Sequence, residues 1–387
     1  MVQTERRPGR LYLPQLDVMR FFAFATVFCT HALPGVDPAS HVGWGRGIAL
    51  LERITQHAGS NGVGLFFLLS AFLITNLLTI ERTSTGSIHL RAFYTRRVLR
   101  IWPLYYLALG IGILIQPLDP GFHLPHDKVV SAFFFFLNWD VAMRGFAWNP
   151  IFVLWTISCE EQFYALWPLM MKVLSPRRML AGCYLTLVAV LGFAYWPAGL
   201  FVRKGATDFA SIFLYFPLGG LLALTAGKSE FRWRPYMLVL WFVGGLLLWE
   251  VGGLLAAPDG MHENALFFLF LGNLIIACGT SLLFMAFFRS DGAMWPKPLI
   301  YLGKISYGLY VYHVMALDLV GTMTGRLGLR LHEGPQHSLI NLATVLGIRM
   351  PLALGLTIAV AAASYRYFET PFLRWKDRFS LVHSREV

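Results

Sequence analysis

The segment from Leu16 to His31 combines an apolar composition with ionisable side chains that hydrocarbon does not tolerate. It is rich in Phe and Ala and, with its flanks, long enough to cross a membrane as a helix, yet it contains Asp17, Arg20 and His31. Eleven steps of about 100° return to within about 20° of the starting direction, so Arg20 and His31 share one helix face, roughly 16 Å apart along the axis. Asp17 lies one turn before Arg20 on nearly the same face. Because charged groups in a membrane span face protein or water, the segment predicts a polar stripe enclosed by other helices.

The whole chain has the composition of an integral membrane protein. Of its 387 residues, 56% are hydrophobic and only 14% are charged, whereas soluble domains carry about 25% charged residues. The net charge of +11 does not indicate nucleic-acid binding, because the basic residues form short clusters between apolar runs, as in membrane proteins that are oriented by charge. We therefore predict an all-α fold, a polytopic membrane bundle of about ten transmembrane helices. Residues 1–387 are expected to form a single domain with no appended soluble domain.

Apolar runs separated by basic or glycine-rich loops define the predicted spans. They cover residues 13–33, 62–80, 101–116, 151–174, 179–197, 209–226, 235–256, 264–288, 299–320 and 340–364. Residues 34–60 are predicted to be a loop because they contain Pro34, Pro38 and several glycines. The run 129–137 is shorter than the roughly 20 residues that a bilayer requires, so it is predicted to be a half-helix on the outer side.

Lys and Arg are concentrated at one set of predicted span ends, including the segment 1–12 and the tail 365–387. The opposite ends hold few basic residues. This asymmetry predicts that both termini lie in the cytoplasm, which requires an even number of spans. A cleaved signal peptide is not predicted, because Asp17 and Arg20 interrupt the first apolar run.

Two groups of basic side chains are candidates for chemistry. His31 is a candidate general base, since a neutral imidazole can take a proton from an attacking hydroxyl; the alternative is a hydrogen-bonded histidine at a helix end. Arg97 and Arg100 lie one turn apart at the start of a predicted helix. With Arg20 they form a cluster suited to an anionic, phosphate-bearing ligand, although arginines at such a position also serve as orientation signals.

Span 151–174 contains the acidic pair Glu160 and Glu161. Adjacent helical residues diverge by about 100°, so one of the two is expected to pair with an arginine or to orient the histidine. A catalytic role and simple charge neutralisation both stay open. Cys159 beside them is expected to be a buried thiol, as are the other cysteines, whose spacing predicts no metal site.

Span 299–320 places Ser306, Tyr310 and His313 on one helix face. His313 is either a second imidazole candidate or a hydrogen-bonding neighbour of His31. The sequence contains no Walker A, GxSxG or HExxH motif, so the common soluble nucleophile and metal sites are absent from it.

An ordered set of motifs resembles the membrane acyltransferase 3 family. The matching segments are Leu16–Arg20 with the arginine–x10–histidine pair Arg20 and His31, Gly64–Leu73, Arg97–Tyr106 with an arginine–x–x–arginine pair, Leu154–Tyr164, Gly303–His313 and Tyr367–Pro371. Together they span nearly the whole chain. One departure is Ala71, where the family usually has glycine; it is expected to affect packing only.

The resemblance implies a bacterial inner-membrane enzyme that moves an acyl group, commonly acetyl, from cytoplasmic acyl-CoA to a hydroxyl of a carbohydrate or small molecule. We assign His31, Arg20 and Glu160 to catalysis and Arg20, Arg97 and Arg100 to donor binding. The further candidates are Asp17, Ser158, Ser306, Tyr310 and His313. No metal and no permanently bound cofactor is expected. The alternative functions are a transporter or flippase for a glycosylated or anionic compound and a catalytically inactive scaffold.

Overall fold

The computed structural model describes residues 12–33, 45–116, 124–145, 149–194, 212–225, 234–256, 265–329, 331 and 338–379. Of these residues, 88% are helical and none lies in a strand, which confirms the predicted all-α class. Five of the described helices are long and apolar enough to cross a membrane. The chain is thus a multi-pass membrane protein, and the count of about ten spans stays a prediction.

The described helices are given in the order in which they occur along the chain. They are α1 (Pro14–Ala32), α2 (Gly45–Thr85), α3 (Leu90–Ile115), α4 (His126–Phe133), α5 (Leu137–Arg144), α6 (Leu154–Val173), α7 (Pro176–Ala194), α9 (Tyr215–Thr225), α10 (Pro235–Ala256), α11 (Ala265–Phe288), the 3₁₀ turn η3 (Gly292–Met294), α12 (Lys297–Lys304), α13 (Ser306–Arg326), α14 (Ser338–Thr344), the π-helical turn η5 (Val345–Arg349), α15 (Met350–Ala363), the π-helical turn η6 (Ser364–Glu369) and α16 (Thr370–Asp377). Helices α6, α7, α10 and α11 agree with predicted spans, apart from residues 195–197 and 264, which lie outside the described part. Helix α9 lies in the sixth predicted span, residues 209–226. Of this span, residues 209–211 and 226 lie outside the described part of the chain.

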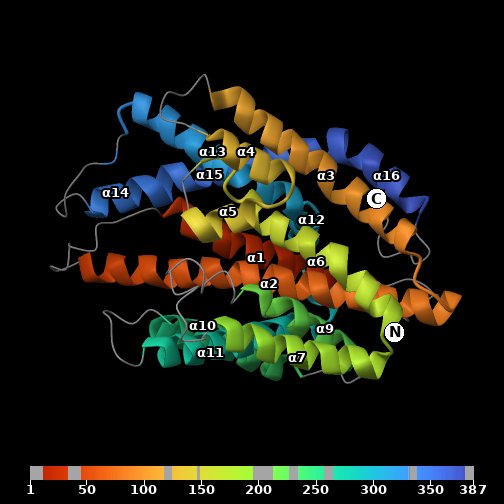
Figure 1. Cartoon of the computed structure of the whole chain (residues 1–387). Helices are drawn as coiled ribbons and strands as arrows, with labels where there is room; N and C mark the ends of the chain where they lie inside the picture. Colours follow the sequence, from red (N-terminus) through yellow and green to blue (C-terminus); the bar gives the residue numbers. More distant parts are fainter. Residues whose placement is uncertain are drawn as a thin grey trace.

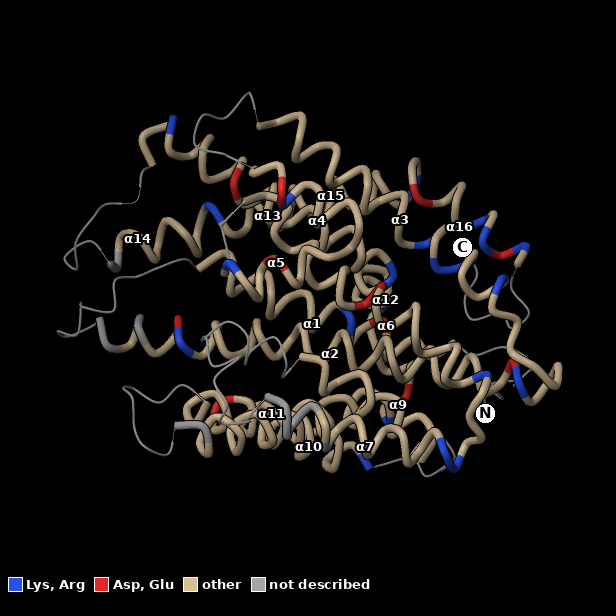
Figure 2. Tube along the Cα trace, viewed as in Figure 1, with Lys and Arg blue, Asp and Glu red and all other residues tan. Residues whose placement is uncertain are grey.

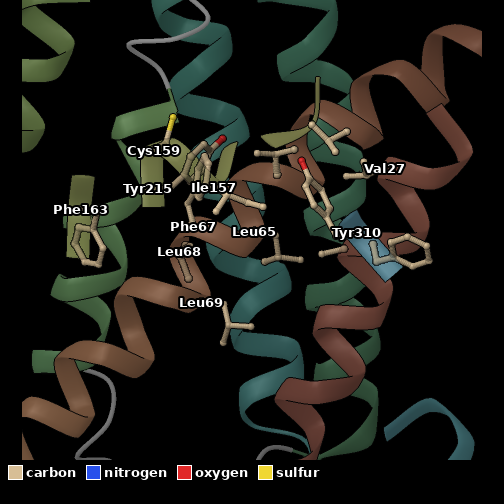
Figure 3. Packing of buried hydrophobic residues seen from close by; sticks show 14 of the residues in the cluster. Val27, Leu65, Phe67, Leu68, Leu69, Ile157, Cys159, Phe163, Tyr215 and Tyr310 are labelled. Carbon is tan, nitrogen blue, oxygen red and sulfur yellow. The ribbon is translucent and has the colours of Figure 1, made fainter. Parts of the chain in front are cut away.

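Helix α1 lies in the middle of the bundle (Figure 1). It packs against α2, α12 and α13, while α10 and α11 pair with each other on one side and α3 with α16 on the other. In the core, Phe67 and Leu68 of α2 pack with Ile157 of α6 and Tyr215 of α9 (Figure 3). Because α1 is enclosed by other helices, its polar stripe faces protein as predicted.

Helix α2 corrects the predicted loop 34–60, because the chain is helical from Gly45 onwards; residues 34–44 lie outside the described part. Gly59, one of the glycines that suggested a loop, is instead a point of close helix packing, as is Gly62 at the start of the second predicted span, whereas Gly47 lies in open space. A Cβ atom at Gly59 would lie 1.9 Å from Oγ1 of Thr30, and one at Gly62 would lie 2.2 Å from Oγ1 of Thr26. Small residues allow such close approach between membrane helices, and the packing compensates for their low helix propensity.

Helix α3 begins at Leu90, eleven residues before the predicted start, so the basic segment that ends at Arg100 is helical. Arg97 and Arg100 therefore lie inside the helix and not at its start. They still point in similar directions because they are one turn apart.

The ninth predicted span is two helices, because the backbone leaves helical geometry at Ile305 between α12 and α13. Helix α12 lies so close to α1 that a Cβ atom at Gly303 would overlap the backbone oxygen of Asp17, 1.8 Å away.

The tenth predicted span is longer than expected. It runs from Ser338 to Asp377 through η5 and η6, so residues 365–377 are not a tail but a helix that packs on α3.

The predicted half-helix 129–137 is a pair of short helices, α4 and α5, joined by a turn in which Phe135 has a φ of 58°. The hydroxyl of Tyr105 donates to the carbonyl oxygen of Ala132 at 2.7 Å. An ion pair of 2.7 Å between Lys128 and Asp140 links the two helices.

Charged side chains are distributed unevenly along the bundle (Figure 2). Among the described residues, Lys and Arg gather at the end near α12 and α16, away from α14. This distribution agrees with the charge asymmetry in the sequence, while the orientation of the termini stays a prediction.

Candidate functional site

A cavity of about 200 Å³ lies between α1, α2, α3, α6, α13 and α16. We call it the cationic cavity, because four basic side chains line it together with two acidic ones. The basic residues are Arg20, Arg97, Arg100 and Lys376, and the acidic ones are Asp17 and Glu160. When all six are ionised, positive charge is in excess. Such a cavity favours a ligand with negatively charged oxygen atoms.

Arg20 and Asp17 pair as their spacing on α1 predicts. Nη1 of Arg20 donates to Oδ1 of Asp17 at 2.5 Å, and the Asp17 side chain is only 1% exposed. A carboxylate buried to this degree requires such a partner. The pair holds the Arg20 guanidinium at the cavity wall.

Arg97 is held by aromatic rings. Its guanidinium carbon lies 5.6 Å from the ring centre of Phe93 and 5.7 Å from that of Tyr164. Its buried Nε has no hydrogen-bond partner among the described residues. A guanidinium that is stacked in this way keeps N–H donors for a ligand.

The structure separates the roles of Glu160 and Glu161, which the sequence left open. Glu160 lines the cationic cavity and accepts a hydrogen bond of 2.6 Å from the Ser70 hydroxyl. Glu161 points elsewhere and accepts from the Trp102 indole at 3.0 Å. Glu160 is therefore the carboxylate that accompanies the arginines.

His31 and His313 form a hydrogen-bonded pair. Nδ1 of His31 lies 2.8 Å from Nε2 of His313, and Nδ1 of His313 lies 2.6 Å from the carbonyl oxygen of Tyr310. A carbonyl oxygen only accepts, so Nδ1 of a neutral His313 carries its proton and its Nε2 accepts from Nδ1 of His31. This network assigns the lone pair of His31 to Nε2. His313 is thus a hydrogen-bonding neighbour of His31 in the structure.

His31 lines a second cavity of about 540 Å³, which we call the histidine cavity. Its other lining residues are Ala32, Leu317, Asp318, Gly321, Thr322, Leu331, Val345 and Arg349. Arg20 and His31 therefore line different cavities. They share a face of α1, but His31 is not among the residues that line the cationic cavity. Tyr310 lies between the two, because its side chain lines the cationic cavity while its carbonyl oxygen holds His313.

The remaining candidates divide into two groups. Ser306 and Tyr310 line the cationic cavity, and the Tyr310 hydroxyl is hydrogen-bonded to that of Thr156 at 2.9 Å. Ser158 does not line it; it is fully buried and donates to the carbonyl oxygen of Leu154 at 3.2 Å. Within the described part of the chain, no group of three or more His, Cys, Asp or Glu residues is placed to hold a metal ion.

Sequence reasoning missed Lys376, Ser70 and Tyr164, which also line the cationic cavity. Lys376 was placed in a tail because the apolar run ends near residue 364. The signal that could have revealed it is Pro371, which stands at a position suited to a helix start and is followed by Leu373, Arg374 and Lys376, which are good helix formers.

Comparison with known proteins gives consistent matches. Residues 13–366 match the family model described as an acyltransferase domain. The chain is 25% identical over 409 aligned positions to the peptidoglycan O-acetyltransferase OatA of Listeria monocytogenes, covering 94% of this chain and 56% of the relative. It is 25% identical over 394 positions to the O-acetyltransferase OatA of Staphylococcus aureus, covering 92% and 60%. The chain therefore spans less than two thirds of the length of these curated relatives. No solved structure matches it significantly.

Proposed function

The chain belongs to the acyltransferase 3 family, and we propose on this basis that it is a membrane O-acetyltransferase. It would transfer an acetyl group from acetyl-CoA, without a permanently bound cofactor, to a hydroxyl of a carbohydrate or small-molecule acceptor. The observation that carries the proposal is the combination of an arginine-lined cavity with a histidine whose basic nitrogen is fixed by a hydrogen-bond network.

The cationic cavity is the proposed donor site. CoA carries several phosphate groups, and arginine side chains bind phosphate oxygens with paired hydrogen bonds. Arg20, Arg97 and Arg100 line the cavity together with Lys376. The unpartnered Nε of Arg97 supplies one such donor. With the predicted orientation, this cavity lies on the cytoplasmic side, where acetyl-CoA is made.

His31 is the proposed general base. The acceptor oxygen forms a bond to the carbonyl carbon of the acetyl group while its proton moves to Nε2 of His31. The bond between carbon and sulfur then breaks, and the CoA thiolate takes the proton from the imidazolium, which restores neutral His31. No covalent enzyme intermediate is required. Base catalysis of this kind is worth about 10²–10⁴ in rate.

His313 is the proposed positioning residue for His31. By accepting from Nδ1 of His31, it holds the ring in place and keeps the lone pair on Nε2. His313 in turn donates to the carbonyl oxygen of Tyr310, a residue that lines the cationic cavity, so the hydrogen-bonded pair is linked to that cavity through Tyr310. We infer that the acetyl end of the donor reaches His31 past the Tyr310 side chain, which turns away from Thr156 when the donor binds.

The proposed acceptor side is the histidine cavity. One relative is named a peptidoglycan O-acetyltransferase, which supports a glycan hydroxyl as acceptor. Both termini are proposed to lie in the cytoplasm of a bacterial inner membrane, which would open the histidine cavity toward the outer face.

The test uses the full chain, purified in nanodiscs and supplied with acetyl-CoA and glycan fragments. We expect release of the CoA thiol together with a product whose mass rises by one acetyl group. The His31→Gln variant should fold and bind donor but lose transfer by about 10²-fold or more. Wild-type protein that consumes no acetyl-CoA with any acceptor would favour the transporter alternative, and full transfer by His31→Gln would remove the assignment of the base.

A further inference from the structure

The histidine cavity has a polar residue that the proposed function does not use. Arg349 lines this cavity together with His31, although the two residues come from opposite halves of the chain. Helix α13 and the turn η5 pack together at this wall, at the end of the bundle away from α16 (Figure 1). Arg349 is therefore placed to contact whatever molecule presents a hydroxyl to His31.

The Arg349 guanidinium is anchored by one contact and retains donors. Nη2 donates to the carbonyl oxygen of Leu329 at 2.8 Å, which fixes the direction of the planar group. Its buried Nε has no acceptor among the described residues. A buried N–H without an acceptor is unfavourable, and a negatively charged oxygen atom from a ligand would satisfy it.

The local backbone is also unusual. Arg349 is the last residue of the π-helical turn η5, which interrupts an otherwise α-helical segment. Such turns are rare and occur frequently at functional sites. Val345 at the start of the same turn lines the cavity too, so both ends of the turn form part of its wall.

We propose that the histidine cavity is the acceptor site and that Arg349 binds a carboxylate or phosphate group carried by the acceptor beside its reacting hydroxyl. The proposal rests on the proposed function, because it concerns the substrate of His31. The polar lining residues besides His31 are Asp318, Thr322 and Arg349, and Arg349 is the one Lys or Arg among the described lining residues.

Asp318 is expected to have the opposite effect to Arg349 on the binding of an anionic acceptor. It lines the same cavity and already takes part in an interaction within the protein. Its negative charge disfavours an anionic acceptor, whereas Arg349 favours one. The two residues therefore provide variants with opposite expected signs.

The first experiment compares acceptors of different charge. Acetyl transfer is measured with methyl glucoside, which is neutral, methyl glucuronoside, which carries a carboxylate, and a glucose phosphate. The measured quantity is the ratio of kcat/KM for each anionic acceptor to that for the neutral one. We expect Arg349→Gln to lower this ratio about tenfold and Asp318→Asn to raise it. Arg326→Gln is the matched control. Arg326 lies near the end of α13, one turn beyond the cavity-lining residue Thr322, but its side chain is exposed and does not line the cavity. The two anionic acceptors tell whether carboxylate or phosphate is preferred.

The second experiment does not need activity. Thr322 is exposed in the histidine cavity, so Thr322→Cys in a chain whose four native cysteines are replaced by Ala gives one labelling site. The rate at which this cysteine reacts with an anionic methanethiosulfonate is compared with its rate with a cationic one. We expect Arg349→Gln, but not Arg326→Gln, to lower the anionic-to-cationic ratio several-fold, and methyl glucuronoside to protect the site better than methyl glucoside.

The outcomes test the proposed acetyl transfer separately from the proposed binding of an anionic acceptor by Arg349. If the wild type consumes no acetyl-CoA, the proposed function fails, and the labelling result still decides whether the cavity binds anions. The assignment of Arg349 is wrong if Arg349→Gln and the wild type have the same kcat/KM ratio and the same labelling-rate ratio. It is also wrong if the neutral and anionic sugars protect Thr322→Cys from labelling equally.

Discussion

His313 offers a pair of substitutions that separate its two hydrogen bonds. Its Nε2 faces His31 and its Nδ1 faces the carbonyl oxygen of Tyr310. The side-chain oxygen of Gln can replace Nε2 as the acceptor for His31, whereas the shorter amide of Asn reaches only the position of Nδ1. His313→Gln should therefore keep His31 in place, and His313→Asn should release it.

The size of the effect follows from the bond that is lost. One hydrogen bond contributes about 0.5–1.5 kcal/mol, and more when a buried partner is left unsatisfied. His313 is fully buried and the bond to His31 is 2.8 Å long, so the upper part of this range applies. Since about 1.4 kcal/mol corresponds to a factor of ten, we expect kcat to fall roughly tenfold or more in His313→Asn and only about two- to threefold in His313→Gln.

The assay is steady-state acetyl transfer at saturating donor, with acetyl-CoA affinity and melting temperature as controls. Affinity should change little in either variant, because His313 does not line the cationic cavity. Equal losses in two variants that both fold would refute the positioning role. Full activity in His313→Asn would show that His31 needs no partner at Nδ1.

Four other predictions follow from the same structure. Arg97→Gln should weaken acetyl-CoA binding roughly 10- to 100-fold, measured by calorimetry, and the difference from the wild type should shrink at high salt because screening weakens the contact with phosphate. Lys376→Gln should weaken it about threefold or more, whereas the exposed Arg374→Gln on the same helix should leave it unchanged; equal effects would remove Lys376 from the donor site. Gly62→Val should destabilise the protein by about 1–3 kcal/mol in thermal unfolding, because its Cβ would overlap Thr26, while Gly47→Ala, in open space, should not. Reporter fusions to the connection between α1 and α2 and to the C-terminus should report opposite sides of the membrane; the same side for both would contradict the predicted topology.

Much of the fold was predictable because it depends on local composition. The apolar runs marked α6, α7, α10 and α11 closely, since a membrane span needs a long stretch of apolar residues. Errors arose at the ends of α2, α3 and α16, where the helical segments extend beyond the apolar runs of the sequence. Glycine, which breaks helices in water, is used at Gly59 and Gly62 for close packing, and only the neighbouring helix reveals that use.

For the site itself, the amino-acid sequence was enough to predict how residues within one helix are arranged. Helical periodicity placed Arg20 and His31 on one face of α1 and kept Arg97 near Arg100, because side-chain direction repeats every 3.6 residues whatever surrounds the helix. The packing of the helices against one another was needed to show that Glu160 lines the cavity with the arginines and that His31 lies in a separate cavity. The bond between His31 and His313 joins residues 282 positions apart, and Lys376 meets the arginines from the far end of the chain. Such contacts depend on how the surfaces of different helices fit together, and that fit is set by the packing of many side chains along their whole length and not by the periodicity of any one helix.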